Sequence, residues 1–232
     1  MGQTPLTVGR TGRSVPERAP EVPYRDLMTT YAALLRGINV GGHRKVPMAD
    51  LRRLLEDLGY ENVRTYLQSG NAVFSTGAAE PGAAGAPTGG AGPAARSGAA
   101  VCGDTDAVTA ALGRAVEDRF GFAVEILVRA HGYLRAVVED CPFPAESLEG
   151  RQLHVTYLSK DVDEDRFAAL DRAAFLPEEF RVGDHALYLY VPDGLGRSRL
   201  ADALAKPALW KGVVATSRNW NTVTRLMEMT RD

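Results

Sequence analysis

Residues 36–42 and Lys45 have the types and spacing expected of a loop that holds an anionic ligand. Three glycines lie there on either side of Asn39, and the basic residue Arg36 precedes them. Glycines allow backbone N–H groups to approach a ligand closely, and nearby cations favour negative charge. The segment matches neither G-x-G-x-x-G nor a P-loop, because no Gly-Lys-Ser/Thr opens the following helix. A loop whose glycines simply turn the chain is an equally good interpretation.

Residues 192–198 form a second candidate, because they lead from a predicted strand into a predicted helix. Ser198 can cap that helix, and Arg197 lies beside the cap. Free N–H groups and the positive end of the helix attract anions. A serine cap after glycines is also ordinary structure, so both interpretations remain open.

The remaining candidates lie at a hairpin turn, residues 68–71, and at the junction of the last strand and helix, residues 218–222. Turn geometry explains the hairpin residues, and Asn221 is expected to cap the last helix. A tryptophan beside amides can stack a planar group or pack between the halves. We expect one pocket with Trp220 in its wall, lined by Arg36, Asn39, Arg197, Arg218 and Asn219. The candidate ligand-binding residues are Arg36, Asn39, Lys45, Gln68, Asn71, Arg197, Ser198, Arg218, Asn219 and Trp220.

The elements that must position these residues follow the order β-α-β-β-α-β twice. In the first half the predicted strands are 30–35, 63–68, 72–75 and 124–128, with helices beginning at Pro47 and at Asp104 or Asp106. A short helix then runs to Asp140. In the second half the predicted strands are 153–158, 180–182, 186–191 and 213–216, with helices at 163–174, at 198–206 and after Asn221. The fold class expected is α+β, a duplicated ferredoxin-like plait of two antiparallel sheets, each covered by helices on one face.

Two segments fall outside these elements. Residues 76–103 include ten Ala, eight Gly and three Pro among 28 residues, too few large apolar side chains to offset the entropy of ordering. They predict a disordered insert within the first half, 29–145, and residues 1–28 predict a disordered extension. The second half spans 150–232.

Composition limits the class of protein. No apolar run approaches the roughly 20 residues that span a bilayer, and two cysteines fit a reducing, cytoplasmic compartment. The four histidines lie far apart, so no metal and no cofactor is predicted. Residues 30–75 and 193–232 together carry a net charge of +5, and residues 104–192 carry −8. An anionic partner would prefer a surface formed by the two ends.

Several motifs occur together in one order along the chain: 34–42, 45–48, 68–71, 194–198 and 218–223. They resemble a bacterial family described as domain of unknown function 1697, over about residues 29 to 229. The resemblance implies a ferredoxin-like duplication and no established enzymatic activity. The chain differs from the family pattern in its N-terminal extension and in the 76–103 insert.

Three functions remain open. The first is a module that binds an anionic ligand in a cleft between the halves: a nucleotide, a phosphorylated metabolite or single-stranded nucleic acid, the last stacked on strand aromatics. The second is an enzyme acting on a small phosphorylated or carboxylated substrate, although the motifs contain no evident nucleophile with its base. The third is a scaffold whose insert binds a partner. The oligomeric state does not follow from the sequence.

Overall fold

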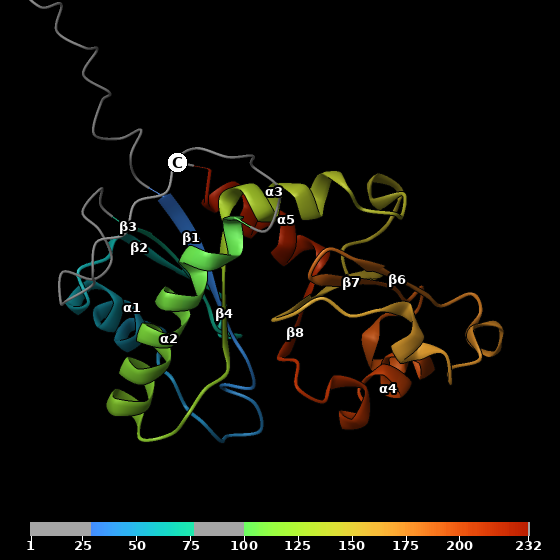
Figure 1. The fold of residues 1–232 in the computed structure, drawn as a ribbon, viewed down its shortest axis with the longest axis horizontal. Coiled ribbons are helices and arrows are strands. Elements are labelled where there is room, and N and C mark those ends of the chain that lie inside the picture. Colours follow the sequence, from blue (N-terminus) through green and yellow to red (C-terminus); the bar gives the residue numbers. More distant parts are fainter. Residues whose placement is uncertain (1–28, 77–99, 232) are drawn as a thin grey trace, which may run out of the picture.

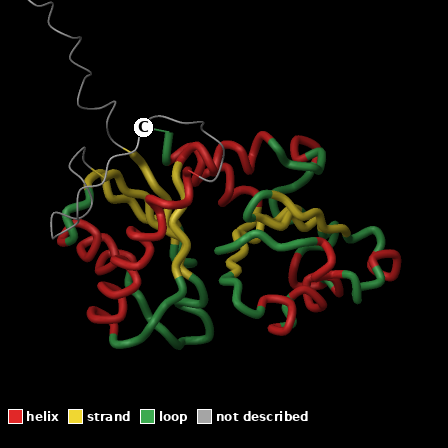
Figure 2. The backbone as a smooth tube through the Cα atoms, in the orientation of Figure 1, coloured by secondary structure: helices red, strands yellow, loops and turns green. Residues whose placement is uncertain are grey.

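The chain folds into two halves, each built around one four-stranded sheet (Figures 1 and 2). The computed structural model describes residues 29–76 and 100–231, except the side chains of 100–104, so the predicted extension and residues 77–99 of the predicted insert lie outside the described residues. The first half contains β1 (Thr29–Leu35), α1 (Met48–Asp57), β2 (Glu61–Tyr66), β3 (Asn71–Thr76), α2 (Ala100–Phe120), β4 (Ile126–Ala130) and α3 (His131–Glu139). After the short turn η2 (Ala145–Ser147), the second half contains β5 (Leu153–Leu158), the 3₁₀ turns η3 (Glu164–Phe167) and η4 (Arg172–Phe175), β6 (Glu179–Gly183), β7 (Ala186–Tyr190), η5 (Leu195–Arg197), α4 (Arg199–Leu204), η6 (Pro207–Trp210), β8 (Ala215–Asn219) and α5 (Trp220–Met229).

Both sheets are antiparallel, with strand orders β2-β3-β1-β4 and β6-β7-β5-β8. The predicted α+β class with two antiparallel sheets is confirmed. The registers also correspond, because β1 and β5 each end in a leucine that pairs with the first residue of the last strand in its half. Counted back from there, Ala33 opposite Val128 in the first sheet corresponds to Thr156 opposite Ser217 in the second.

Each sheet is covered on both faces, whereas helices on one face only were expected. α1 and α2 cover the outer face of the first sheet, and α4 with the 3₁₀ turns covers the outer face of the second. Between the sheets, α3 and α5 pack against each other and against the two inner faces (Figure 1). Buried side chains include Tyr31, Leu55 and Val116 in the first outer core, Leu134, Tyr157 and Val223 in the central core, and Phe167, Leu187 and Leu200 in the second outer core.

Two predicted helices differ from the structure. The helix expected at 163–174 is wrong, because two 3₁₀ turns take its place. Asp171 accepts a hydrogen bond from the backbone N–H of Ala173, which starts a new turn where a helix would have to continue. The helix expected from Asp104 or Asp106 begins at Ala100 instead, so its first residues, 100–103, belong to the segment that was predicted to be a disordered insert. No helix in residues 29–76 or 100–231 has the length and apolar character needed to cross a membrane.

The hairpin between β2 and β3 depends on Gly70. Its φ is +80°, and a Cβ there would lie 2.7 Å from Cδ1 of Ile38 and 2.9 Å from Cβ of Leu35. The backbone N–H of Leu35 also donates to the Gly70 carbonyl at 2.8 Å. The turn therefore packs directly against the end of β1 and the residues that follow it.

We predict that Gly70→Ala lowers the free energy of unfolding by about 2–4 kcal/mol, because left-handed strain and overpacking add. Gly41→Ala is the control, since Gly41 has a φ of +60° but open space around its Cα. Chemical denaturation of both variants measures the difference. Equal losses would show that crowding at the turn is unimportant.

Candidate functional site

The loop after β1 is held by the side chain of Asn39. Its amide donates to the carbonyls of Val46 at 3.0 Å and Gln68 at 2.9 Å, and its oxygen accepts the N–H of Val46 at 2.9 Å. Asn39 has a φ of +56°, a conformation that asparagine tolerates better than most residues. Its functional groups are thus used within the protein, where they tie the loop to the hairpin turn.

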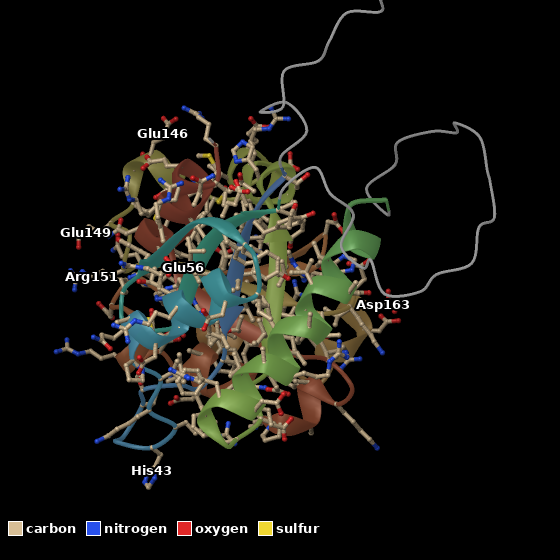
Figure 3. All side chains as sticks on the ribbon, turned by 90° about the vertical axis from the view of Figure 1, so that its left-hand side faces the viewer. His43, Glu56, Glu146, Glu149, Arg151 and Asp163 are labelled. Carbon is tan, nitrogen blue, oxygen red and sulfur yellow. The ribbon has the colours of Figure 1, made fainter. Side chains whose placement is uncertain are left out.

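The outer part of this loop projects from the first half. His43 points away from the body at its tip (Figure 3), and the candidate residues Lys45 and Gln68 are exposed. Arg36, at the base of the loop, pairs with Glu125 at 2.5 Å, and their side chains are 46% and 52% exposed. Arg36 therefore lies close to the body of the protein, at the base of the loop, and its side chain still reaches solvent.

Arg218 lies between the two halves and is buried. From β8 its guanidinium reaches the end of β1 and the neighbouring hairpin turn. Each of its nitrogens donates to oxygens of the protein: Nε to Oδ1 of Asn71 at 2.6 Å, Nη1 to Oγ1 of Thr216 and the carbonyl of Ser217 at 2.8 Å each, and Nη2 to the carbonyl of Leu35 at 2.9 Å. Arg218 and Asn71 are both on the candidate list, and the structure brings them into direct contact.

Burial lowers the pKa of Arg218 to about 10, so the guanidinium remains charged at neutral pH. The acceptors around it are carbonyl, amide and hydroxyl oxygens, which satisfy its donors without a carboxylate. A ligand would have to break these bonds to reach it. Arg218 consequently joins the halves, and it is not exposed to a cleft.

Arg129 repeats this arrangement in the opposite direction and has no motif around it to mark it in the sequence. It occupies on β4 the position that Arg218 occupies on β8, counted from the strand start. It donates to the carbonyl of Leu158 at the end of β5, and its guanidinium lies 5.1 Å from the centre of the Tyr133 ring. Each half therefore sends one buried arginine to the end of the central strand of the other half.

The helix start at Ser198 is already occupied by a carboxylate of the same chain. Ser198 Oγ accepts from the N–H of Ala201 at 2.8 Å, as the predicted cap requires. The same hydroxyl donates to Oε2 of Glu178 at 2.7 Å, and that oxygen also accepts the N–H of Leu200 at 2.8 Å. Glu178 therefore takes the place where an external anion was expected, and Arg197 beside it is exposed.

At the last junction, Asn219 rather than Asn221 caps the final helix. Its side chain accepts the N–H of Thr222 at 3.0 Å, and α5 begins at Trp220. Trp220 is partly buried against the central core. The predicted cap at Asn221 was wrong by two residues, and both Asn219 and Trp220 have structural roles.

An open cavity of about 410 Å³ lies on the outer face of the second sheet, beneath α4 and η6. Its lining includes residues of three strands, the η5 turn and η6, among them Thr156, Leu187, Leu189, Gly196, Trp210 and Ser217. Among the described residues that line it, Arg36 alone comes from the first half. Of the ten candidate residues, Arg36 lines the cavity, beside Leu195 and Gly196 of the 192–198 loop. The expected shared pocket is therefore not formed: the candidates that do not line this cavity are Asn39, Lys45, Gln68, Asn71, Arg197, Ser198, Arg218, Asn219 and Trp220.

Two residues in the lining of this cavity are polar, whereas the residues at the corresponding positions of the first sheet are apolar. Thr156 Oγ1 and Ser217 Oγ lie 2.6 Å apart, and Ser217 is exposed. The corresponding residues Ala33 and Val128 are buried in the core beneath α1 and α2. In the second half the 3₁₀ turns replace the counterpart of α1, so the sheet is less completely covered. A single polar residue in a strand gives no signal in the sequence. Thr156 and Ser217 stand out only when the two sheets are aligned by register.

His154 extends the polar positions along the same face of β5, two residues before Thr156. It is buried, and its Nδ1 has no hydrogen-bond partner among the described residues. Burial lowers the pKa of His154, which favours the neutral ring. Its counterpart in the first half is Tyr31.

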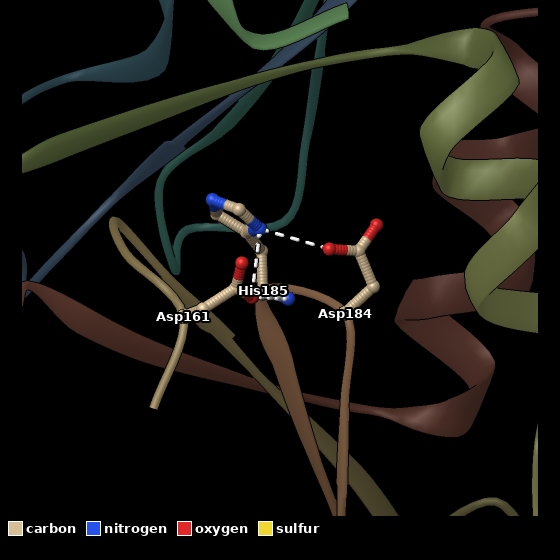
Figure 4. Close-up of side chains that lie close together, drawn as sticks. All are labelled: Asp161, Asp184 and His185. Carbon is tan, nitrogen blue, oxygen red and sulfur yellow. Dashed lines mark hydrogen bonds and ion pairs between the residues drawn. The ribbon is translucent and has the colours of Figure 1, made fainter. Parts of the chain in front are cut away.

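A separate acidic cluster lies at the turn between β6 and β7 (Figure 4). His185 Nδ1 lies 2.9 Å from Oδ1 of Asp161 and 3.0 Å from Oδ1 of Asp184. The His185 backbone N–H also donates to Asp161 at 2.8 Å, although His185 has a φ of +47°. The ligand atoms of these three residues lie within 4.8 Å of one another, but the nitrogen nearest the carboxylates is already shared between them. We assign the cluster the role of holding the turn.

Comparison with known proteins adds family and fold. The family described as "Protein of unknown function (DUF1697)" matches residues 28–86 and 94–188. The chain belongs to this family. The conserved bacterial protein SP0830 from Streptococcus pneumoniae is similar in structure, with a TM-score of 0.59 and 23% sequence identity over 88% of this chain and 99% of that chain. No match was found among curated proteins. The family resemblance inferred from the motifs is confirmed, and the function must be argued from the site.

We predict that Arg218→Lys lowers the free energy of unfolding by about 2–4 kcal/mol, because lysine keeps the charge but cannot make the forked bonds to Asn71 and Leu35. Arg225→Lys is the control, since Arg225 forms an exposed ion pair with Glu228 at 3.1 Å. It should change stability by no more than about 0.5 kcal/mol. Denaturant titration gives both values, and a similar small loss for the two variants would contradict the linking role.

His154 predicts a dependence of stability on pH. Its pKa is lowered in the folded state, so on acidification the unfolded chain takes up the proton first. Stability should therefore fall as the pH drops below the ordinary histidine pKa of about 6.5. His154→Leu should flatten the curve of unfolding free energy against pH in this range, and His43→Gln in the projecting loop should not. An unchanged curve in His154→Leu would show that His154 does not titrate on unfolding.

Proposed function

We propose that the protein binds a small anionic molecule in the cavity over the second sheet. The observation that carries the proposal is the composition of its lining: one arginine from the first half faces hydroxyl groups and backbone glycine of the second. A volume of about 410 Å³ is typical of small-molecule sites, which combine apolar walls with a few polar groups. Residues that lie far apart in the sequence thus supply one site.

Arg36 is suited to exchange its partner for a ligand. Its contact with Glu125 engages Nη1 at 2.5 Å, and arginine carries five N–H donors. Both side chains are about half exposed, and an ion pair of this kind contributes only about 0–1 kcal/mol. An anion that enters the cavity can therefore share or replace the carboxylate at modest cost.

The burial of the strand aromatics favours a small molecule over single-stranded nucleic acid. Tyr31, Phe74 and Tyr188 are buried in the cores, and the strand tyrosines Tyr66 and Tyr190 are partly buried. Both faces of both sheets are covered, so these rings cannot stack on bases without unfolding. The affinity that a ferredoxin-like sheet gains from exposed aromatics has no counterpart at these positions.

The lining also favours binding over catalysis. Among the described residues that line the cavity there is no histidine, cysteine or lysine, and Asp202 is its carboxylate. The hydroxyls of Thr156 and Ser217 bond to each other, with no base at hydrogen-bond distance among the described residues. A nucleophile requires such a base or a lowered pKa.

We further propose that the two halves are a duplicated ferredoxin-like plait. The strand orders, the helix that each half has between its third and fourth strands, and the matched positions of Arg129 and Arg218 support this assignment. Loss of the helix between β5 and β6 then accounts for the thinner cover over the cavity of the second half.

The proposal predicts that at least one class of small anion raises the melting temperature in a thermal-shift screen of nucleotides, sugar phosphates, carboxylates and oligonucleotides, because a ligand of the native state stabilises it by RT ln(1 + [L]/Kd). Arg36→Met should abolish the shift. Arg181→Met is the matched control: Arg181 is 47% exposed, pairs with Glu179 at 2.6 Å and lines a separate hollow of about 240 Å³. A shift lost only in Arg181→Met would move the site to that hollow and contradict the proposal.

A further inference from the structure

We infer that the ligand of this cavity is an amphipathic monoanion, a single acidic group on an apolar body, and not a polyphosphate. The inference rests on the proposed function and concerns the chemistry of the molecule that fits. Three properties of the lining lead to it: its charge balance, its apolar walls and its one pair of hydroxyls.

The charges in the cavity balance. Arg36 is the cation and Asp202 the anion among the described lining residues, and Asp202 makes no hydrogen bond or ion pair with another described side chain. A ligand with one negative charge is attracted to Arg36 and can place its neutral part toward Asp202. A nucleoside triphosphate would bring several charges to one arginine and hold some of them near a carboxylate in a partly desolvated space, where repulsion is strong. Selection against polyanions follows.

The walls require an apolar body. Leu187, Leu189, Leu204 and Trp210 line the cavity together with alanines of α4 and β8. The indole N–H of Trp210 donates to the carbonyl of Leu204 at 2.5 Å, so this residue offers apolar ring atoms and no donor. An apolar or aromatic group buried there leaves water, whereas a sugar would leave its hydroxyls without partners.

The hydroxyl pair can orient the acidic group. Thr156 and Ser217 together carry two O–H hydrogens, and the bond between them at 2.6 Å uses one. The other can donate to an oxygen of the ligand. Arg36 and this hydroxyl would then hold one carboxylate or other monoanionic oxygen group, and neither position requires a second charge.

The experiment is calorimetric titration of the full chain with phenylbutanoate, its neutral analogue phenylbutanol, ATP and a short oligothymidylate. Phenylbutanoate should bind at least about tenfold more tightly than each of the others, since only it has both the charge and the apolar body. Tighter binding of phenylbutanol would overturn the requirement for charge. Tighter binding of ATP or the oligonucleotide would overturn the requirement for a monoanion.

Two substitutions should change the affinity for phenylbutanoate in opposite directions. Arg36→Met should weaken phenylbutanoate binding about tenfold or more, because it removes the charge-assisted hydrogen bond. Glu125→Gln should strengthen it up to about fivefold, because it frees Arg36 from a competing carboxylate. A merely structural Arg36–Glu125 pair would give the same sign for both variants. Arg181→Met is the control and should leave the affinity unchanged.

The outcomes separate this inference from the proposed function. If ATP or a sugar phosphate binds and Arg36→Met abolishes that binding, the cavity is the site but the monoanion class is wrong. If no small anion in the screen binds, or Arg36→Met changes nothing, the proposed function itself fails. A weakening by Asp202→Asn would also overturn the class, because it would show that the ligand brings a positive group to Asp202.

Discussion

The buried guanidinium of Arg218 holds the second half of the protein against the end of β1, and the geometry of the cavity depends on it. Its Nη2 bonds the carbonyl of Leu35, the residue immediately before Arg36. The placement of Arg36 against the second sheet is therefore fixed by a charge that lies on the other face of β8. Burial of that charge costs free energy, as the lowered pKa of Arg218 reflects, and oxygens from both halves offset the cost. Arg129 makes the corresponding bond to Leu158 from the first half.

Two arginines that reach in opposite directions restrict the halves more than one would. The bonds of Arg129 to Leu158 and of Arg218 to Leu35 add to the packing of α3 against α5 in the central core, and together they fix one relative orientation of the halves. Within this symmetric frame the outer faces are free to differ. The first is filled by the apolar side chains of α1 and α2, and the second keeps Thr156 and Ser217 under a thinner cover. The second half thus keeps an open cavity on its outer face, and the first half contributes the cation Arg36 to the lining.

The sequence predicted the elements whose signals are local and repeated. A compact apolar run at residues 30–35 marked β1, and Pro47 and Ser198 marked the starts of two helices. It failed where two local signals compete. Both Asn219 and Asn221 are good caps, and the choice depends on where β8 stops, which is set by pairing with β5. The segment 163–174 has helical spacing, but the side chain of Asp171 accepts the N–H of Ala173 and starts a separate 3₁₀ turn there.

The candidate site was predicted in part for the same reason. Arg36 stood out in a motif and lines the cavity beside Leu195 and Gly196, whereas the candidates of the loop after β7, Arg197 and Ser198, do not. Arg218, Asn39 and Asn71 stood out equally, yet their polar groups form hydrogen bonds within the protein that hold the halves and loops together. Thr156 and Ser217 gave no motif, because they form a pair only across two strands that are about sixty residues apart in sequence. Such a pair can be predicted only when the register between the two strands is known, and the register is set by the fold.

The most direct measurement of the central claim uses the emission of Trp210 in the cavity wall. The chain has two tryptophans, so Trp220→Phe leaves Trp210 as the single reporter. If a small monoanion binds there, phenylbutanoate should change the emission of this variant along a saturable curve, and Arg36→Met should move the curve to about tenfold higher concentration. Unchanged emission at concentrations where calorimetry detects binding would place the ligand elsewhere and contradict the account.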